Sequence, residues 1–160
     1  MMSGYRTEKA KAARQCTKSL RELLLGYRHL LEDTLREEGL TLPQLRLLKA
    51  IAENGGVSGA AIARTCYVTP QTLQAMLARA ARERWIVRQH SARNQRIITA
   101  SLTRKGAGVL ARGLEMAAQI EAKIWEGVSV GTLDQVNMVL DRGVTNLHAS
   151  AEHQHTASHA

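Results

Sequence analysis

The sequence contains no phenylalanine, and only five of its 160 side chains are aromatic. Its core must therefore be built from Leu, Ile, Val and Ala, which suits the packing of helices better than that of two β-sheets. The length is enough for one well-packed domain, or for a small domain carried on helices. We expect a mainly α-helical protein with one functional unit per chain.

The sequence is also poor in cysteine and in long apolar runs. Its two cysteines, Cys16 and Cys66, have the spacing of neither a disulfide framework nor a metal site. No apolar run approaches the roughly 20 residues needed to span a bilayer. The N-terminal sequence MMSGYRTEKAKAARQ has no hydrophobic signal region. We therefore expect a cytoplasmic protein with no membrane partner and no cofactor.

The last thirteen residues, HASAEHQHTASHA, lack the apolar periodicity of the preceding segment. They predict a tail without regular structure, which we assign to residues 151–160. Histidines in such a tail are more often solvated than metal-bound, so no metal site is predicted.

Positive charge is concentrated in the middle of the chain. Residues 40–106 contain eleven Lys or Arg and only two acidic residues, whereas the rest contains eleven basic and twelve acidic residues. A basic segment of this kind is typical of a domain that binds nucleic acid.

The first half of the chain predicts three helices. Apolar residues recur at spacings of three and four over about residues 7–38, and Gly39 is suited to end that helix. Thr41 and Gln44 have the spacing of a capping box at the start of the next helix, which Asn54-Gly55-Gly56 would end. Ser58 would begin a short third helix.

The fourth predicted helix begins at Thr69, because the proline that follows is tolerated in the first turn. The helical period separates an inward apolar stripe from an outward polar face. The stripe consists of Leu73, Met76, Leu77 and Ala80, and the outward face of Gln71, Gln74, Ala75 and Ala78.

A β-hairpin should follow this helix. β-Branched residues at 86–87 and 97–102 flank an arginine-bearing loop at 90–96, and Thr103 would cap the next helix. That helix should end near Gly127, and Ser129 should begin a last one.

The last helix has an apolar stripe with heptad spacing, and the first helix has a stripe of its own. A second copy of the chain is the simplest partner for both stripes, so we expect a homodimer. The predicted dimer contacts are Leu20, Leu24, Leu133, Val136, Leu140 and Leu147.

This order of elements resembles the MarR family of winged helix-turn-helix transcriptional regulators. The resemblance covers about residues 20–147 and rests on four segments: GLTLPQ at 39–44, the capped helix from Thr69, the Asn94-Gln95-Arg96 end of the wing, and SLTRKG at 101–106. It implies a mainly α fold in which a winged helix-turn-helix domain with a hairpin wing, residues 40–106, lies between dimerisation segments 1–39 and 107–150.

The sequence departs from the family pattern at two positions. Asn94 stands where the family usually has Asp, so it cannot form an ion pair that would hold Arg96 in place. Trp85 stands where Gly is common, so we do not expect a left-handed helix end there, and the joint to the first strand should be built differently.

The resemblance implies that the protein binds a palindromic DNA duplex. Gln71 and Gln74 would contact base edges in the major groove, while Thr69 and Thr72 would contact phosphates. A solvated helix face is the alternative interpretation of the glutamines. The expected cationic contacts are Arg79, Arg88, Arg93, Arg96 and Arg104, of which Arg93 and Arg96 lie in the wing and suit the minor groove.

The resemblance further implies a small phenolic or anionic effector bound between the dimer helices and the DNA-binding domain. Candidate pocket residues are Tyr27, His29 and Trp125, each of which is equally compatible with packing or surface exposure.

Cys16 lies near the place where peroxide sensors of the family have their reactive thiol. Its neighbours lack the aromatic residues of those sensors, so we expect an inert cysteine and keep redox sensing as an alternative.

Two other function classes were compared with DNA binding. A basic helical module that binds an acidic protein remains an alternative. An enzyme is not expected. Cys66, His90 and Asn94 could be imagined as the residues of a thiol hydrolase, but His90 and Asn94 belong to the expected wing and nothing supplies a pocket or an oxyanion hole.

Overall fold

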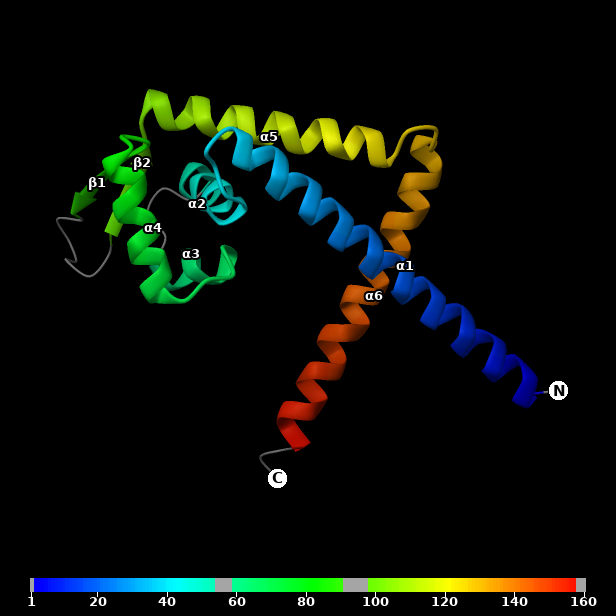
Figure 1. Ribbon diagram of the computed structural model, residues 1–160. Coiled ribbons are helices and arrows are strands. Elements are labelled where there is room, and N and C mark those ends of the chain that lie inside the picture. The colour runs from blue at the N-terminus through cyan, green and yellow to red at the C-terminus, as the bar shows by residue number, and fades with distance from the viewer. Residues whose placement is uncertain (1, 54–58, 91–97, 158–160) are drawn as a thin grey trace. The chain divides into compact units, whose positions relative to one another are not determined.

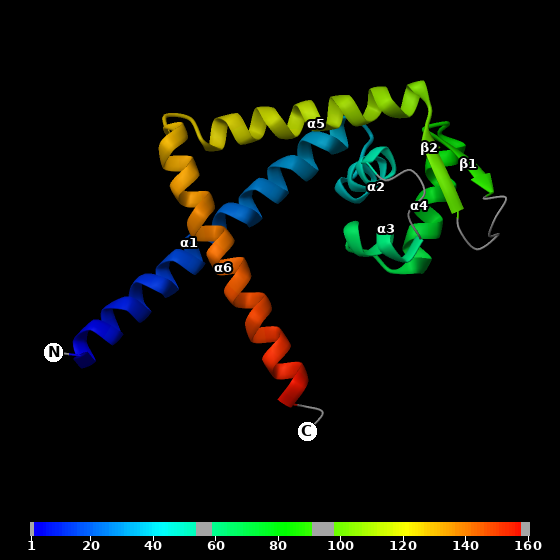
Figure 2. The same cartoon turned by 180° about the vertical axis from the view of Figure 1, so that it is seen from behind.

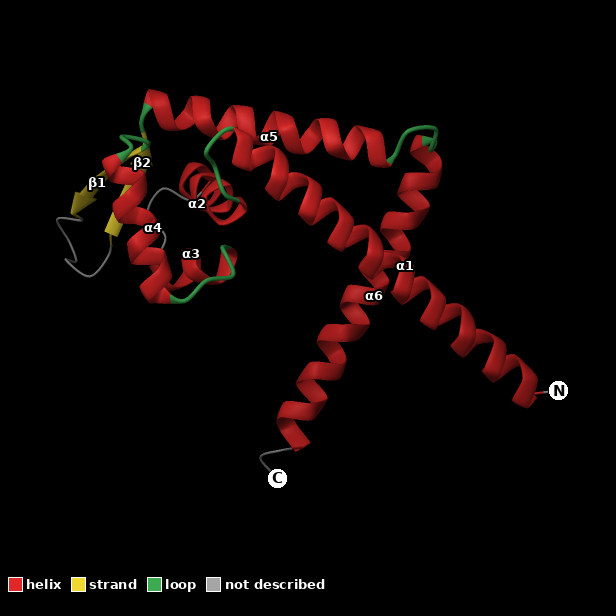
Figure 3. Ribbon diagram, in the orientation of Figure 1, coloured by secondary structure: helices red, strands yellow, loops and turns green. Residues whose placement is uncertain are grey.

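The computed structural model describes residues 2–53, 59–90 and 98–157, and it is mainly helical with one two-stranded hairpin (Figures 1 and 3). The chain divides into two compact units, residues 1–121 and residues 122–160. The elements are α1 (Met2–Glu37), α2 (Leu42–Glu53), α3 (Gly59–Thr65), α4 (Pro70–Arg82), β1 (Ile86–His90), β2 (Ile98–Leu102), α5 (Arg104–Ile124) and α6 (Val130–Ala157). The expected fold class is confirmed.

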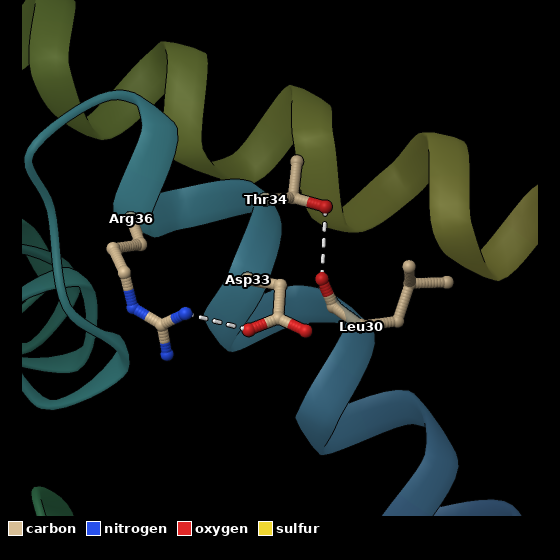
Figure 4. A network of polar contacts seen from close by, with 4 residues as sticks. All are labelled: Leu30, Asp33, Thr34 and Arg36. Atoms are coloured by element: carbon tan, nitrogen blue, oxygen red, sulfur yellow. Dashed lines mark hydrogen bonds and ion pairs between the residues drawn. The ribbon is translucent and has the colours of Figure 1, made fainter.

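Helix α1 ends as the sequence predicted, in a left-handed glycine. Gly39 has a φ of 68°, and the Leu40 N–H donates to the carbonyl of Leu35 at 3.0 Å. In the last turns, Thr34 Oγ1 donates to the Leu30 carbonyl at 2.8 Å and Arg36 Nη1 to Asp33 Oδ1 at 2.8 Å (Figure 4). These contacts are local to α1, so they stabilise the helix end without tying it to another element.

Helix α2 lies in the middle of the first unit and contacts α1, α3, α4 and β2. Its start is the predicted capping box, since the Thr41 N–H donates to Gln44 Oε1 at 3.0 Å and the Gln44 N–H donates to Thr41 Oγ1 at 3.4 Å. The side chains at the centre of the core are Leu35, Leu47, Leu48, Cys66, Leu73 and Leu77. The predicted stop at residues 54–56 and the predicted cap at Ser58 lie outside the described residues.

The two strands form an antiparallel hairpin in which Ile86 is opposite Leu102 and His90 is opposite Ile98. Ile86 and Ala100 are buried, so the base of the hairpin packs on the core. Figures 1 and 2 show the hairpin beside α4. Of the loop predicted at residues 90–96, His90 belongs to β1, and residues 91–96 lie outside the described residues.

In the second unit, the helix start predicted at Ser129 is present, because the Thr132 N–H donates to Ser129 Oγ at 3.2 Å. Helix α6 continues to Ala157, whereas we expected no regular structure from residue 151. The segment 149–157 contains neither Gly nor Pro, and three of its nine residues are Ala, which favours helix over coil. Among the helices that the structure describes, none is both long and apolar enough to cross a membrane.

Candidate nucleic-acid interface

Helix α4 begins at the predicted cap. Thr69 is extended, with φ −71° and ψ 156°, and its hydroxyl accepts a hydrogen bond from the Thr72 N–H at 3.1 Å. The two threonine hydroxyls share a further hydrogen bond of 2.9 Å. This arrangement orients the first turn of α4 and leaves both threonines exposed.

The two faces of α4 are divided as the sequence predicted. Its inward side chains are buried in the core, namely Leu73, Met76, Leu77 and Ala80. Its outward side chains are exposed, namely Gln71, Gln74, Ala75 and Ala78. The outward face is therefore polar, uncharged and accessible to a partner.

One residue of the hairpin contacts this outward face. Arg88 on β1 donates from Nη2 to Oε1 of Gln74 at 3.0 Å. The sequence predicts both residues as DNA contacts but does not predict a bond between them. The two positions are fourteen residues apart in different elements, so no sequence pattern indicates the contact.

At the end of α4, Trp85 does not take the left-handed conformation, as expected. A left-handed end is present, but Arg84 forms it with a φ of 59°. The Trp85 N–H donates to the carbonyl of Ala80 at 2.8 Å, and the indole side chain is buried. The helix therefore ends one residue earlier than the family pattern suggested, which allows Trp85 to enter the core.

The SLTRKG segment, residues 101–106, links this helix end to the start of α5 by hydrogen bonds. Thr103 Oγ1 donates to the carbonyl oxygens of Arg84 at 2.7 Å and of Trp85 at 3.2 Å. The Thr103 N–H donates to the same Trp85 carbonyl at 2.9 Å. One threonine thus joins the end of α4, the start of β1 and the start of α5. We call the contact between residues 83–85 and 103–106 the clasp.

Two more residues complete the clasp. Lys105 Nζ donates to the Glu83 carbonyl at 2.9 Å, where it also faces the negative end of the α4 dipole. The Gly106 N–H donates to Thr103 Oγ1 at 3.0 Å, and a Cβ at Gly106 would lie 2.7 Å from the carbonyl carbon of Trp85. Only glycine fits at this closest point between α5 and the chain after α4.

Three of the five arginines selected from the sequence, Arg79, Arg88 and Arg104, are exposed. Arg93 and Arg96 lie outside the described residues, as does Asn94. A further pair near the start of α4 was not predicted from the sequence: the guanidinium carbon of the half-buried Arg46 lies 5.2 Å from the centre of the Tyr67 ring, and Tyr67 is 83% exposed. An aromatic residue directly before a capped helix was the available signal.

The candidate pocket residues have different environments. Tyr27 is half-buried, and its hydroxyl donates to Glu121 Oε1 at 3.0 Å. Burial, together with the hydrogen bond and the charge of Glu121, raises the pKa of Tyr27 to about 12. His29 is exposed. Trp125 belongs to the other unit, residues 122–160. The Tyr27 hydroxyl therefore already has a hydrogen-bond partner, the Glu121 carboxylate on α5.

The two thiols also differ. Cys16 is exposed on α1, and the neighbouring cations have other partners: Arg14 Nε donates to the Ala10 carbonyl at 3.3 Å, and Lys18 pairs with Glu22 at 3.8 Å. Cys66 is buried, and burial raises the pKa of its thiol, so it packs as a small apolar side chain. No cluster of His, Cys, Asp and Glu suited to a metal occurs in the described parts of the chain.

The structure has a capped helix with an exposed polar face, and a hairpin follows this helix. Hydrogen bonds link the end of that helix to the start of the next one. This arrangement defines a winged helix-turn-helix protein. Residues 38–97 match the model of the MarR family. The matched residues include α2, α3, α4 and β1.

Similar proteins agree with this assignment. The HTH-type transcriptional repressors Rv2887 of Mycobacterium tuberculosis and Mb2911 of Mycobacterium bovis are 29% identical over 86 residues, which is 54% of this chain and 62% of their own length. The matched segment thus spans less than two thirds of these curated relatives.

Solved structures share the fold. The M. tuberculosis MarR family protein Rv2887 in complex with p-aminosalicylic acid has a TM-score of 0.65 at 23% identity, covering 79% of this chain and 95% of that chain. A protein of unknown function from Listeria innocua has a TM-score of 0.71 at 21% identity, covering 88% and 98%. Wild-type MarR from E. coli without ligand has a TM-score of 0.67 at 16% identity, covering 79% and 94%.

Proposed function

We propose that this protein is a MarR-type transcriptional regulator that binds double-stranded DNA through α4 and the hairpin. The outward face of α4 carries the proposal, because its glutamines are exposed and one of them, Gln74, is bonded to the cation Arg88. Arg79 and Arg104 are further exposed cations of the same domain. Glutamine amides match hydrogen-bonding groups on base edges in the major groove, while cations neutralise phosphates. Relatives named as transcriptional repressors support the same function.

We assign the DNA contacts to residues 40–106. The proposed set is Thr69, Gln71, Thr72, Gln74, Arg79, Arg88, Arg93, Arg96 and Arg104. Within it, the glutamines contact bases, the threonines contact phosphates, and the wing arginines contact the minor groove and the backbone.

A comparison of two variants tests this proposal. Gln71→Ala should relax sequence preference, because a bidentate base contact contributes about 1–3 kcal/mol of discrimination. Arg96→Ala should weaken binding to all sequences and lower the salt slope by up to about one unit. Binding is measured by fluorescence anisotropy on selected and scrambled duplexes over ~50–200 mM salt. If the wild type binds selected and scrambled duplexes equally well, the protein is only a nonspecific basic one, and the proposal of sequence-specific binding is wrong.

We further propose that the protein acts as a homodimer held by residues 1–39 and 107–150. Large apolar side chains that a single chain leaves exposed support this proposal, since such surfaces usually mark an interface. On α1 they are Leu20, Leu23, Leu24, Leu25 and Leu30, and on α6 they include Leu140, Val144 and Leu147. Leu133 and Val136 are half-buried on the same stripe of α6. A dimer would also match the two half-sites of a palindromic duplex.

The dimer is tested with a pair of substitutions on α6. Leu140→Asp should shift the protein toward the 17.6 kDa monomer in light scattering, because it places a charge in the proposed dimer interface. Met138→Asp is the control, because Met138 is also exposed but lies about 200° around the helix from Leu140. If both variants dissociate equally, or if the wild type is monomeric at micromolar concentration, the proposed dimer contact through Leu140 is wrong.

We propose a small phenolic or anionic effector that releases the DNA, with Tyr27 and His29 as candidate pocket residues and the cytoplasm as the place of action. A structure of the relative Rv2887 contains salicylic acid, so salicylate is the first compound to titrate against the protein–DNA complex. Release at millimolar salicylate, but not at equal benzenesulfonate, would support specific recognition. No release by either compound would contradict a salicylate-like effector.

A further inference from the structure

Tyr67 carries an exposed aromatic ring at a backbone position that favours glycine. Its φ is 55°, and its N–H donates to the carbonyl of Arg64 at 3.0 Å. The next N–H, that of Val68, donates to the carbonyl of Ala63 at 3.0 Å. This pair of hydrogen bonds ends α3 in a left-handed turn, in which glycine is the least strained residue. Tyr67 is 83% exposed, so burial of the ring does not offset the strain.

A cation from another helix lies against this ring. The guanidinium carbon of Arg46, on α2, is 5.2 Å from the ring centre, which is within the range of cation–π attraction. Arg46 is half-buried. In the described part of the chain, no carboxylate forms an ion pair with it. The contact therefore holds the ring at the surface and leaves the charge of Arg46 without a counterion from the protein.

The Tyr67–Arg46 pair lies beside the proposed DNA interface. Tyr67 is two residues before Thr69, and both Thr69 and Thr72 are exposed in the first turn of α4. Residues 59–82 contain three arginines and no acidic residue. A strained side chain is more typical of a binding site than of a surface without a partner. The charge around this ring suits an anionic partner.

We propose that Tyr67 binds a DNA phosphate and that Arg46 positions its ring for this contact. A phenol can donate its O–H, and the Tyr67 hydroxyl has no hydrogen-bond partner among the residues that the structure describes. Tyrosine is one of the side chains that commonly contact phosphate oxygens. The inference rests on the proposed DNA-binding function and adds to it a contact in the turn between α3 and α4.

Two substitutions at Tyr67 separate binding from folding. Tyr67→Phe keeps the ring beside Arg46 but removes the donor, so binding to selected and scrambled duplexes should weaken alike by at least about 3-fold, the effect of one net hydrogen bond. Tyr67→Gly removes both the strain and the contact. Its binding should weaken at least as much, while its Tm stays unchanged or rises by up to about 4 °C. Fluorescence anisotropy and thermal melting of the full chain measure these two effects.

A substitution of Arg46 tests the positioning role. Arg46→Met should lower the salt slope by up to about one unit. It should also make the effect of Tyr67→Phe smaller than in the wild type, because the ring is no longer held, and a double-mutant cycle measures this coupling. Arg14→Met is the matched control, because it removes an exposed arginine of α1 outside residues 40–106. Its salt slope and its coupling to Tyr67→Phe should equal those of the wild type.

The outcomes distinguish this inference from the function on which it rests. If the wild type binds no duplex, both are wrong. If the wild type binds DNA and Gln71→Ala relaxes its sequence preference, but Tyr67→Phe binds as tightly as the wild type, only the phosphate contact of Tyr67 is wrong. If Tyr67→Gly lowers the Tm and leaves DNA affinity unchanged, Tyr67 is a structural residue and the inference is overturned. Weaker binding by Tyr67→Phe at an unchanged Tm would establish the contact.

Discussion

Replacing Gly106 by alanine tests whether the clasp holds the winged domain together. An added Cβ would overlap the carbonyl oxygen of Trp85 and lie 2.7 Å from its carbonyl carbon and 3.0 Å from its Cα. These are backbone atoms, so no side-chain rotation can make room. The Trp85 carbonyl is also bonded to Thr103, whose hydroxyl holds the end of α4. The start of α5 must therefore move away from the clasp.

The expected cost follows from three terms. Overpacking in a tightly packed site costs about 1–3 kcal/mol. Weakening one or two hydrogen bonds of the clasp costs roughly 0.5–1.5 kcal/mol each. The higher helix propensity of alanine offsets these costs by up to about 1 kcal/mol. We expect Gly106→Ala to lower the free energy of unfolding by about 2–3 kcal/mol, which corresponds to a decrease in Tm of roughly 4–12 °C for a chain of this size.

Thermal and urea unfolding at one fixed protein concentration measure this change. Gly108→Ala is the matched control on the same helix, because its Cβ would meet only the flexible end of Arg112 at 3.8 Å. That variant should be as stable as the wild type or more stable by up to about 1 kcal/mol. If Gly106→Ala unfolds at the same temperature as Gly108→Ala, the close approach that we describe is refuted.

Three further predictions concern single side chains. The folded state keeps the Tyr27 proton up to a pKa of about 12, whereas an unfolded phenol loses it near pH ~10, so the wild type should lose stability relative to Tyr27→Phe as pH rises through that window. Urea unfolding in steps from pH 9 to 12 measures the difference, and parallel curves would count against the buried hydrogen bond to Glu121. Thr69→Ala should cost about 1 kcal/mol by removing the cap of α4, and Thr69→Ser should restore most of it; equal denaturation midpoints for all three proteins would contradict the cap. Cumene hydroperoxide should leave the DNA complex intact, and release from the wild type but not from Cys16→Ser would reveal a redox switch.

Much of the fold was predictable because the signals are local in the chain. The capping boxes and caps at Thr41, Thr69, Thr103 and Ser129 involve residues only three positions apart, as the hydrogen bonds show. The buried stripe of α4 follows from the helical period alone. The expected tail was less accurate, because loss of apolar residues ends a buried stripe but does not by itself end a helix.

The sequence alone determined which segments form helices, where most of them begin, which face of α4 is buried, and where positive charge gathers. The tertiary structure decided the contacts between segments. Arg84 and not Trp85 takes the left-handed conformation, and Thr103, nineteen residues after Arg84, binds the Arg84 carbonyl. Gln74 has a bonded oxygen because the hairpin brings Arg88 beside α4. Such contacts depend on how the elements pack, and helical or strand periodicity describes each element only by itself.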